Sequence, residues 1–87
     1  MINKYIRLEK IGFVIWSGEP GKSTMEWKSH YEMSRFFPRY KVISAGFCGA
    51  KFGEELACWG YSESLGIGSS PEDIIALRHQ LGIGQNE

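Results

Sequence analysis

A glycine- and serine-rich segment, residues 60–73, constrains the fold of this chain more than any other feature. It holds three glycines and four serines, and it lies between an apolar run at 55–59 and an apolar helical pattern at 74–81. Glycine and serine favour turns, so we expect the first run to end here as a strand and the second to begin here as a helix. The free N–H groups of such a connection, its hydroxyls and the helix dipole favour an anion, above all phosphate.

The second half of this segment is explained as the start of a helix. Ser70 is a favourable N-cap, Pro71 suits the first helical position, and Asp73 completes a capping box. We therefore predict a helix over 74–81, ended by the glycine that follows it. The first half, residues 60–68, has two possible interpretations: it is an anion site, or it is a connection that binds nothing.

Three β-favouring runs account for the sheet. Residues 5–16 predict one strand bent near Gly12 or two short strands, and residues 40–48 and 55–61 predict two more. With one helix after the first run and another at the end, the predicted order is β(β)αββα. We therefore expect an α/β (α+β) fold in a single domain, residues 1–87, with two helices packed on a small mixed β-sheet of about four strands.

The first predicted helix spans residues 24–37. Ser23 and Glu26 form a capping-box pattern at its start, and Pro38 follows its end. On a helical wheel the aromatic side chains share one broad face with His30, which directs the histidine toward the protein body. A histidine titrates near neutral pH and can act as base, acid or nucleophile, so His30 is a candidate catalytic residue. The alternative is a histidine buried beside aromatic rings with no chemical role.

Composition argues against several classes of function. Lys and Arg number ten and Asp and Glu number ten, so the chain lacks the basic excess of a nucleic-acid-binding protein. No apolar run is long enough to span a membrane, and the first residues lack the apolar core of a signal peptide. We therefore expect a cytoplasmic protein that binds neither nucleic acid nor membrane.

Cys48 and Cys58 are the only cysteines. Two cysteines without a secretion signal do not form a disulfide framework, and no CxxC motif or nearby histidine completes a zinc site. A hairpin over residues 40–61 would place the two thiols opposite each other. We expect both thiols to be reduced and half-buried, and we expect no metal ion and no cofactor.

Four short motifs occur in an order that is typical of one known family. The first strand carries the pair Lys4-Tyr5, and the first predicted helix carries a tryptophan followed by a histidine, Trp27 and His30. A glycine-containing strand follows at 44–46, and the next strand ends in Trp-Gly-Tyr-Ser at 59–62. The last motif is the most specific, because it is similar to a Tyr-Gly-Tyr-Ser segment that also continues to a glycine. Over most of its length the chain thus resembles the Janus/Ocnus family, which includes the eukaryotic phosphohistidine phosphatase.

The resemblance implies a small α/β phosphatase that acts without a metal. It makes His30 the general base toward water and Lys4 the positive charge that neutralises the phosphoryl group. A loop would hold that group through its amides and hydroxyls, and the loop residues are Gly60, Tyr61, Ser62, Glu63, Ser64 and Gly66. The implied partner is a phosphorylated protein or a small phosphorylated molecule. Because a P–N bond is labile, positioning and charge neutralisation are enough for such chemistry.

Three positions depart from the family pattern and keep other functions open. Ser29 stands where the family often has Tyr, Phe47 stands where an Arg often follows the glycine strand, and Glu63 places a negative charge in the proposed phosphate loop. One alternative is a non-enzymatic interaction module that uses exposed aromatic side chains such as Trp16, Trp59 or Phe52, with the loop as a scaffold. Another is a small-ligand-binding module in which Glu63 contacts the hydroxyls of a sugar phosphate.

Overall fold

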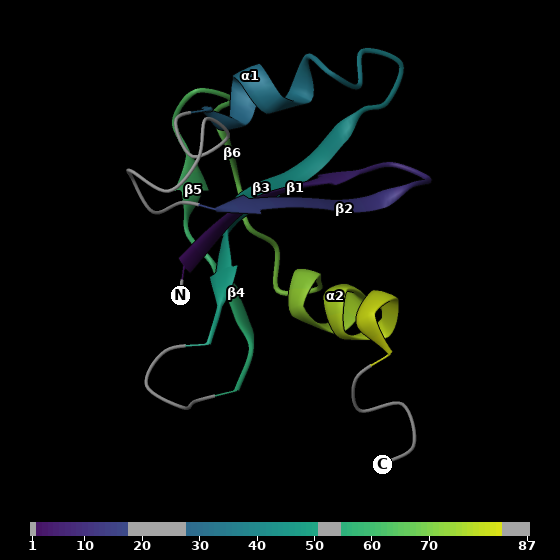
Figure 1. Ribbon diagram of the computed structural model, residues 1–87, viewed down its shortest axis with the longest axis vertical. Helices are drawn as coiled ribbons and strands as arrows, with labels where there is room; N and C mark the ends of the chain where they lie inside the picture. The colour runs from purple at the N-terminus through teal and green to yellow at the C-terminus, as the bar shows by residue number, and fades with distance from the viewer. Residues whose placement is uncertain (1, 18–27, 51–54, 83–87) are drawn as a thin grey trace.

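The computed structural model describes residues 2–17, 28–50 and 55–82, and it has an α+β fold (Figure 1). The element order is ββαββββα, which adds two short strands to the predicted order. The strands are β1 (Ile2–Leu8), β2 (Gly12–Ser17), β3 (Val42–Gly49), β4 (Ala57–Trp59), β5 (Tyr61–Ser62) and β6 (Ile67–Gly68). The helices are α1 (His30–Ser34) and α2 (Asp73–Leu81).

The main sheet has four strands in the order β2-β1-β3-β4, which confirms the predicted strand number and fold class. All three pairs in this sheet are antiparallel, so the prediction of a mixed sheet is wrong. The chain passes from β2 over α1 to β3, and these two strands run in the same direction. β1 lies between them, however, so the two parallel strands never share hydrogen bonds. The run over residues 5–16 forms two strands, and the bent single strand is excluded.

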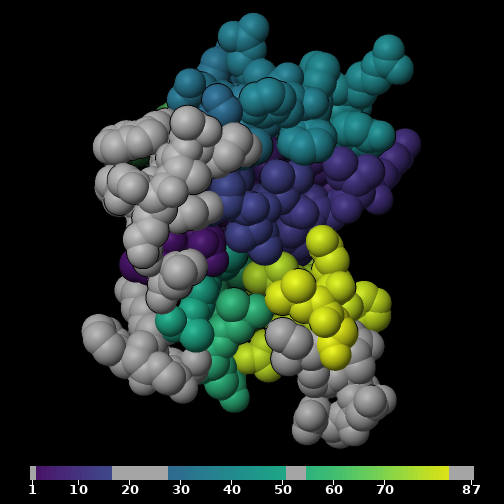
Figure 2. Space-filling view, in the orientation of Figure 1, coloured from purple at the N-terminus to yellow at the C-terminus, as the bar shows by residue number. Residues whose placement is uncertain are grey.

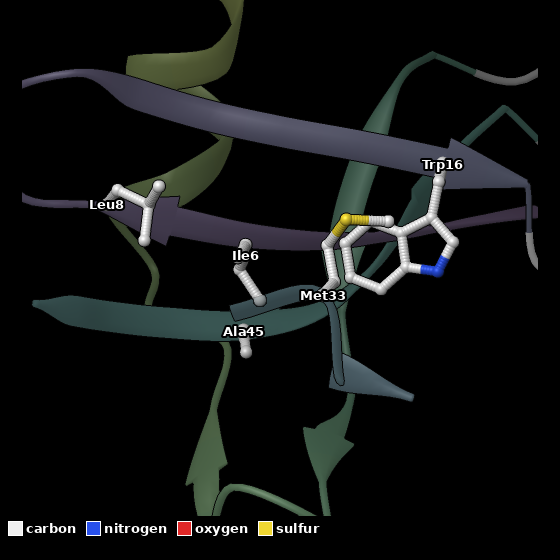
Figure 3. Packing of buried hydrophobic residues seen from close by; sticks show 5 residues of the cluster. All are labelled: Ile6, Leu8, Trp16, Met33 and Ala45. Carbon is white, nitrogen blue, oxygen red and sulfur yellow. The ribbon is translucent and has the colours of Figure 1, made fainter. Parts of the chain in front are cut away.

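The side chains of β1 alternate between two cores, one on each face of the sheet. The core on the α1 face consists of Ile6, Leu8, Trp16, Met33 and Ala45 (Figure 3). The core on the α2 face consists of Tyr5, Cys48 and Leu77. Figure 1 shows the two helices on opposite sides of the sheet, and in Figure 2 β2 is visible between the α1 region and α2. The domain therefore has three layers, helix, sheet and helix.

Helix α1 is shorter than predicted and begins later. Residues 28 and 29 are not helical, and Ser29 is the N-cap of a helix that begins at His30. The Ser29 hydroxyl accepts from the Glu32 N–H, and the Glu32 carboxylate accepts from the Ser29 N–H, both at 3.0 Å. The helix predicted over 24–37 is therefore wrong at residues 28–29 and after Ser34, and its proposed start at Ser23 and Glu26 lies outside the described residues.

Helix α2 ends as predicted at Gly82, but it begins at Asp73 and its N-cap is Glu72, whose side chain makes no capping hydrogen bond, so the predicted N-cap at Ser70 and the helical position of Pro71 are wrong. The Asp73 carboxylate accepts from the Ser70 N–H at 2.9 Å, and the Ser70 hydroxyl accepts from the Glu72 N–H at 3.3 Å. At the other end Gly82 adopts the left-handed conformation with a φ of 75°. No helix in the described ranges is long and apolar enough to cross a membrane.

The strand predicted over 55–61 divides at Gly60, which has a φ of 92°. β4 pairs with β3 as far as Trp59, whereas β5 pairs with β6 in a separate two-stranded sheet. A Cβ at residue 60 would lie 2.7 Å from the Phe47 ring, so glycine allows the chain to turn this close to β3. The turn directs the following loop toward the α1 side of the molecule (Figure 1).

Candidate functional site

His30 is the first residue of α1, and its imidazole is only 5% exposed. The ring lies edge-on to Trp16 of β2 and to Phe47 of β3, with centroid distances of 5.6 Å to each. Its Nε2 lies 2.8 Å from the carbonyl oxygen of Gly46. The histidine therefore faces the sheet, as predicted, and both aromatic rings and a backbone carbonyl fix its orientation.

The hydrogen bond to Gly46 defines the protonation state of His30. A carbonyl oxygen only accepts, so Nε2 carries the proton and Nδ1 carries the lone pair. Burial lowers the pKa of His30, the positive charge of Lys4 lowers it further, and the Gly46 bond only partly offsets both. His30 is therefore a neutral imidazole at pH 7, and a neutral imidazole can accept a proton.

Lys4 reaches the same face of the sheet from β1. Its register partners are Trp16 and Phe47, the two residues whose rings flank His30. Lys4 Nζ donates to the carbonyl oxygen of Lys28 at 3.1 Å, and Trp16 Nε1 donates to the same oxygen at 3.2 Å. The two bonds hold the segment just before α1 against the sheet, which explains why residues 28 and 29 are not helical.

The predicted phosphate loop contacts α1 one residue after His30. The Ser64 hydroxyl accepts from the backbone N–H of Tyr31 at 3.1 Å. Inside the loop, the Ser62 hydroxyl accepts from the Leu65 N–H at 3.2 Å, and the Ser62 carbonyl accepts from the Gly66 N–H at 2.8 Å. The loop is thus a closed turn that is fastened to the first turn of α1.

The loop residues differ in how far they are available to a ligand. Ser62 is 1% exposed, and its hydroxyl already holds the turn. The other predicted members are exposed: Gly60, Tyr61, Glu63, Ser64 and Gly66. The exposed surface of the loop therefore carries the Glu63 carboxylate, a tyrosine ring, one hydroxyl and backbone groups.

Sequence reasoning identified Asp73 only as a capping residue, but this side chain also joins α2 to the sheet. It is 0% exposed and accepts hydrogen bonds from the hydroxyls of Tyr5 and Ser44. Arg7 pairs with it at 3.2 Å, and the Ser70 N–H completes the set. Burial alone would raise the pKa of Asp73, but the hydrogen bonds from Tyr5, Ser70, Ser44 and Arg7 together lower it. Burial, together with the hydrogen bond to Asp73, raises the pKa of Tyr5. Tyr5 and Arg7 are two positions apart on one strand and so share a face of the sheet, which indicates a polar patch there. This spacing does not indicate which acidic residue packs on the patch.

Cys48 and Cys58 are register partners across β3 and β4, which confirms that the thiols lie opposite each other. Both are free; Cys48 is buried and Cys58 is half-buried. Burial raises the pKa of Cys48 to about 11. Burial, with contributions from Cys48 and Asp73, raises the pKa of Cys58 to about 12.

We expect both thiols of the folded protein to react slowly with iodoacetamide, because the thiolate is the reactive form. At pH 8 the rate should be roughly a hundredfold or more below that of the urea-unfolded chain, whose thiols titrate at about 8.5. It should rise about tenfold for each pH unit up to pH 10, since each unit raises the thiolate fraction tenfold. Mass spectrometry of timed samples measures both rates. Equal rates for folded and unfolded chains would contradict the raised pKa values.

Two surface hollows are lined by residues from the C-terminal end of α1, the segment before β3 with its first residue, and the turn after β1. One of about 480 Å³ is lined by Ser34, Arg35, Phe37, Pro38, Tyr40 and Val42. Another of about 200 Å³ is lined by Glu9, Lys10, Arg39, Tyr40 and Lys41. Residues 2–17, 28–50 and 55–82 contain no group of three or more His, Cys, Asp or Glu side chains that could hold a metal ion.

The geometry thus brings Lys4, His30 and the loop over residues 60–66 together around the start of α1. Sequence reasoning missed Trp16 and Phe47, which hold the imidazole, because strand register is not visible in one sequence. Trp27, the tryptophan of the family motif, lies outside the described residues. Comparisons with protein families, with curated proteins and with solved structures found no match for this chain.

Proposed function

We propose that this protein binds a phosphoryl group beside α1 and hydrolyses it, with phosphohistidine as the substrate class. His30 is the general base, Lys4 neutralises phosphoryl charge, and the loop over residues 60–66 holds the group. The substrate is a phosphorylated protein or a small phosphorylated molecule, and the protein acts in the cytoplasm.

The observation that carries this proposal is the meeting of three chain segments, which lie far apart in the sequence, at the first turn of α1. Lys4 binds the carbonyl of Lys28, His30 follows two residues later, and Ser64 binds the N–H of Tyr31. A cation, a neutral imidazole and a loop with exposed backbone groups are the parts that phosphoryl hydrolysis without a metal requires.

The proposed step is a single displacement. A water oxygen attacks phosphorus while His30 takes the water proton on Nδ1, and the P–N bond breaks. The leaving nitrogen keeps the electron pair of the P–N bond, and His30 then returns the proton to this nitrogen. Lys4 offsets the charge that the phosphoryl oxygens carry in the transition state. The bond from Nε2 to Gly46 fixes the ring and its tautomer.

His30→Gln tests the role of the base. The glutamine amide can still donate to the Gly46 carbonyl but cannot accept a proton, so we expect phosphohistidine hydrolysis to fall by about 10²–10⁴-fold. His30→Ala should lose at least as much, and His79→Asn, at the other histidine of the chain, should change the rate little. Thermal unfolding followed by circular dichroism shows whether each variant remains folded. A folded His30→Gln variant with full activity would exclude the proposed base.

The pH profile supplies a second readout of the same group. Because the pKa of His30 lies below its ordinary value, the base form persists at neutral pH and is lost only under more acidic conditions. After correction for spontaneous hydrolysis, the enzymatic rate should be flat near neutrality and fall as the pH drops through this lowered pKa.

One observation favours a non-enzymatic interaction module instead. The imidazole is almost fully buried between two rings and is held by Gly46, as expected for a structural histidine. Of the aromatic side chains expected to be exposed in such a module, Trp16 is buried, Trp59 is half-buried and Phe52 lies outside the described residues. Other aromatic side chains are exposed instead, among them Tyr31, Phe36 and Tyr61. Titration with inorganic phosphate, followed by amide chemical shifts, separates the two functions. Shifts at residues 60–66 and His30 support the phosphoryl site, and shifts confined to other regions exclude it.

A further inference from the structure

Four cations gather at the end of the sheet opposite His30. We name this the hairpin-end surface and define it by Lys10, Arg35, Arg39, Tyr40 and Lys41, all of which are exposed. Lys10 lies in the turn between β1 and β2, Arg35 caps α1, and the other three precede β3. The Glu9 N–H donates to the Lys41 carbonyl at 2.8 Å and joins the turn to the segment before β3 (Figure 1).

The charges of this surface are not neutralised within the described part of the chain. Lys10, Arg39 and Lys41 form no ion pair there, and Arg35 lies 5.9 Å from the centroid of the Tyr31 ring. Among the described residues that line the adjacent hollows, Glu9 is the one with a carboxylate. The whole chain has a formal net charge of zero, so this surface is a local excess of positive charge that attracts anions.

The backbone at Lys10 gives a second argument. This residue has a φ of 77°, in the left-handed region, where a side chain other than glycine or asparagine costs about 1 kcal/mol. The turn itself would be more stable with glycine or asparagine at that position. A lysine there adds charge to the hairpin-end surface and nothing to the stability of the turn.

We propose that the hairpin-end surface docks an acidic segment of a partner protein. The two hollows of about 200 and 480 Å³ share Tyr40, so they lie side by side and can take successive side chains of one segment. Arg35 and Arg39 present planar forks that suit carboxylates, and the exposed Tyr40 ring offers apolar contact between them. A nucleic-acid backbone binds along an extended basic stripe. This surface includes Glu9 and belongs to a chain of zero net charge, so it does not suit a nucleic acid.

This docking surface is separate from the proposed catalytic site. Lys4 and Glu9 are five residue steps apart along β1 and its end, which corresponds to about 17 Å at about 3.4 Å per residue. The inference therefore holds whether or not His30 is catalytic, and His30→Gln should bind the partner segment as the original protein does.

Fluorescence anisotropy with a labelled decapeptide of alternating glutamate and glycine tests the proposal. Arg39→Gln combined with Lys41→Gln should raise the Kd about tenfold at about 50 mM salt, and binding should weaken as salt is added. Ile75→Glu combined with Ala57→Glu makes the same change in net charge at exposed positions, with Ala57 at the opposite end of the sheet, and should alter the Kd less than about twofold. Circular dichroism confirms that both double variants are folded.

Two results would overturn the proposal. One is the absence of measurable peptide binding, or binding that the Arg39 and Lys41 substitutions leave unchanged. The other is a single-stranded oligonucleotide of equal charge that binds as tightly as the peptide and loses affinity with the same substitutions, since the partner would then be a nucleic acid.

Discussion

Asp73→Ala is expected to lower the free energy of unfolding by about 3–5 kcal/mol, a large share of the 5–15 kcal/mol that is typical of a domain. The carboxylate is fully buried and accepts from Tyr5, Ser44, Arg7 and the Ser70 N–H. Its removal leaves four donors without their acceptor, among them the buried hydroxyls of Tyr5 and Ser44 and the partly exposed Arg7 cation. It also removes the polar contacts between the start of α2 and the sheet. Urea unfolding followed by tryptophan fluorescence measures the loss.

Asp73→Asn separates charge from shape in the same site. The asparagine side chain has nearly the volume of the aspartate side chain, but its NH₂ group faces hydrogen-bond donors where one carboxylate oxygen accepted from them. We therefore expect a smaller loss of unfolding free energy, about 2–3 kcal/mol. Glu72→Gln is the matched control, because Glu72 is the neighbouring exposed acid and its side chain makes no capping hydrogen bond. That control should stay within about 0.5 kcal/mol of the original protein. An Asp73→Ala variant as stable as the control would show that Leu77 and the hydrogen bond from the Phe13 N–H to Gln80 hold α2 on the sheet without Asp73.

The contribution of Asp73 also depends on pH in a defined direction. Its folded pKa lies below the ordinary value of about 3.9, so the stabilisation is complete above about pH 4 and is lost as the pH falls through the folded pKa. The difference in unfolding free energy between the original protein and Asp73→Asn should therefore shrink on acidification from pH 6 to pH 3. A difference that stays constant over this range would contradict the lowered pKa.

Features that depend on residues close together in the sequence could be predicted. The bond from the Ser70 N–H to the Asp73 carboxylate, the bond from the Glu72 N–H to the Ser70 hydroxyl and the left-handed Gly82 are all local, and the end of α2 at Gly82 occurs as expected. The strand runs and the fold class also follow from local apolar patterns. The sequence offers two capping boxes for α1, however, and the box at Ser29 begins the described helix because Lys4 and Trp16 bind the carbonyl just before it.

Features that depend on long-range register could not be predicted. Nothing near Asp73 in the sequence indicates Tyr5 or Arg7 as partners, since both lie more than 60 residues away. The break at Gly60 also depends on Phe47, which lies across the sheet. At the candidate site the sequence placed His30 on the inner face of its helix, but the Trp16 and Phe47 rings around it follow from strand pairing.

Gly46→Ala is the second substitution expected to have a large effect on stability. A Cβ at this position would lie 2.4 Å from the carbonyl oxygen of Trp59 and 3.4 Å from the Cβ of Ser69. The first contact is with backbone, so the substitution must displace β4 from β3, at a cost of about 1–3 kcal/mol. The conformation of Gly46 itself is ordinary, so this cost is purely steric. Gly82→Ala is the contrasting control, because its Cβ would meet nothing within 4 Å and it loses only about 1 kcal/mol from its positive φ.

Gly46→Ala also reports on how His30 is held. The Gly46 carbonyl accepts the Nε2 proton, and this bond raises the pKa of His30 against the larger effect of burial. Displacement of the strand should weaken the bond, so the NMR titration midpoint of His30 should move to lower pH in Gly46→Ala and stay unchanged in Gly82→Ala. Loss of stability with an unchanged midpoint would mean that β4 moves while the carbonyl of Gly46 keeps its place. If neither quantity changed, the close approach of Trp59 to β3 would not be required for the fold or for the position of the imidazole.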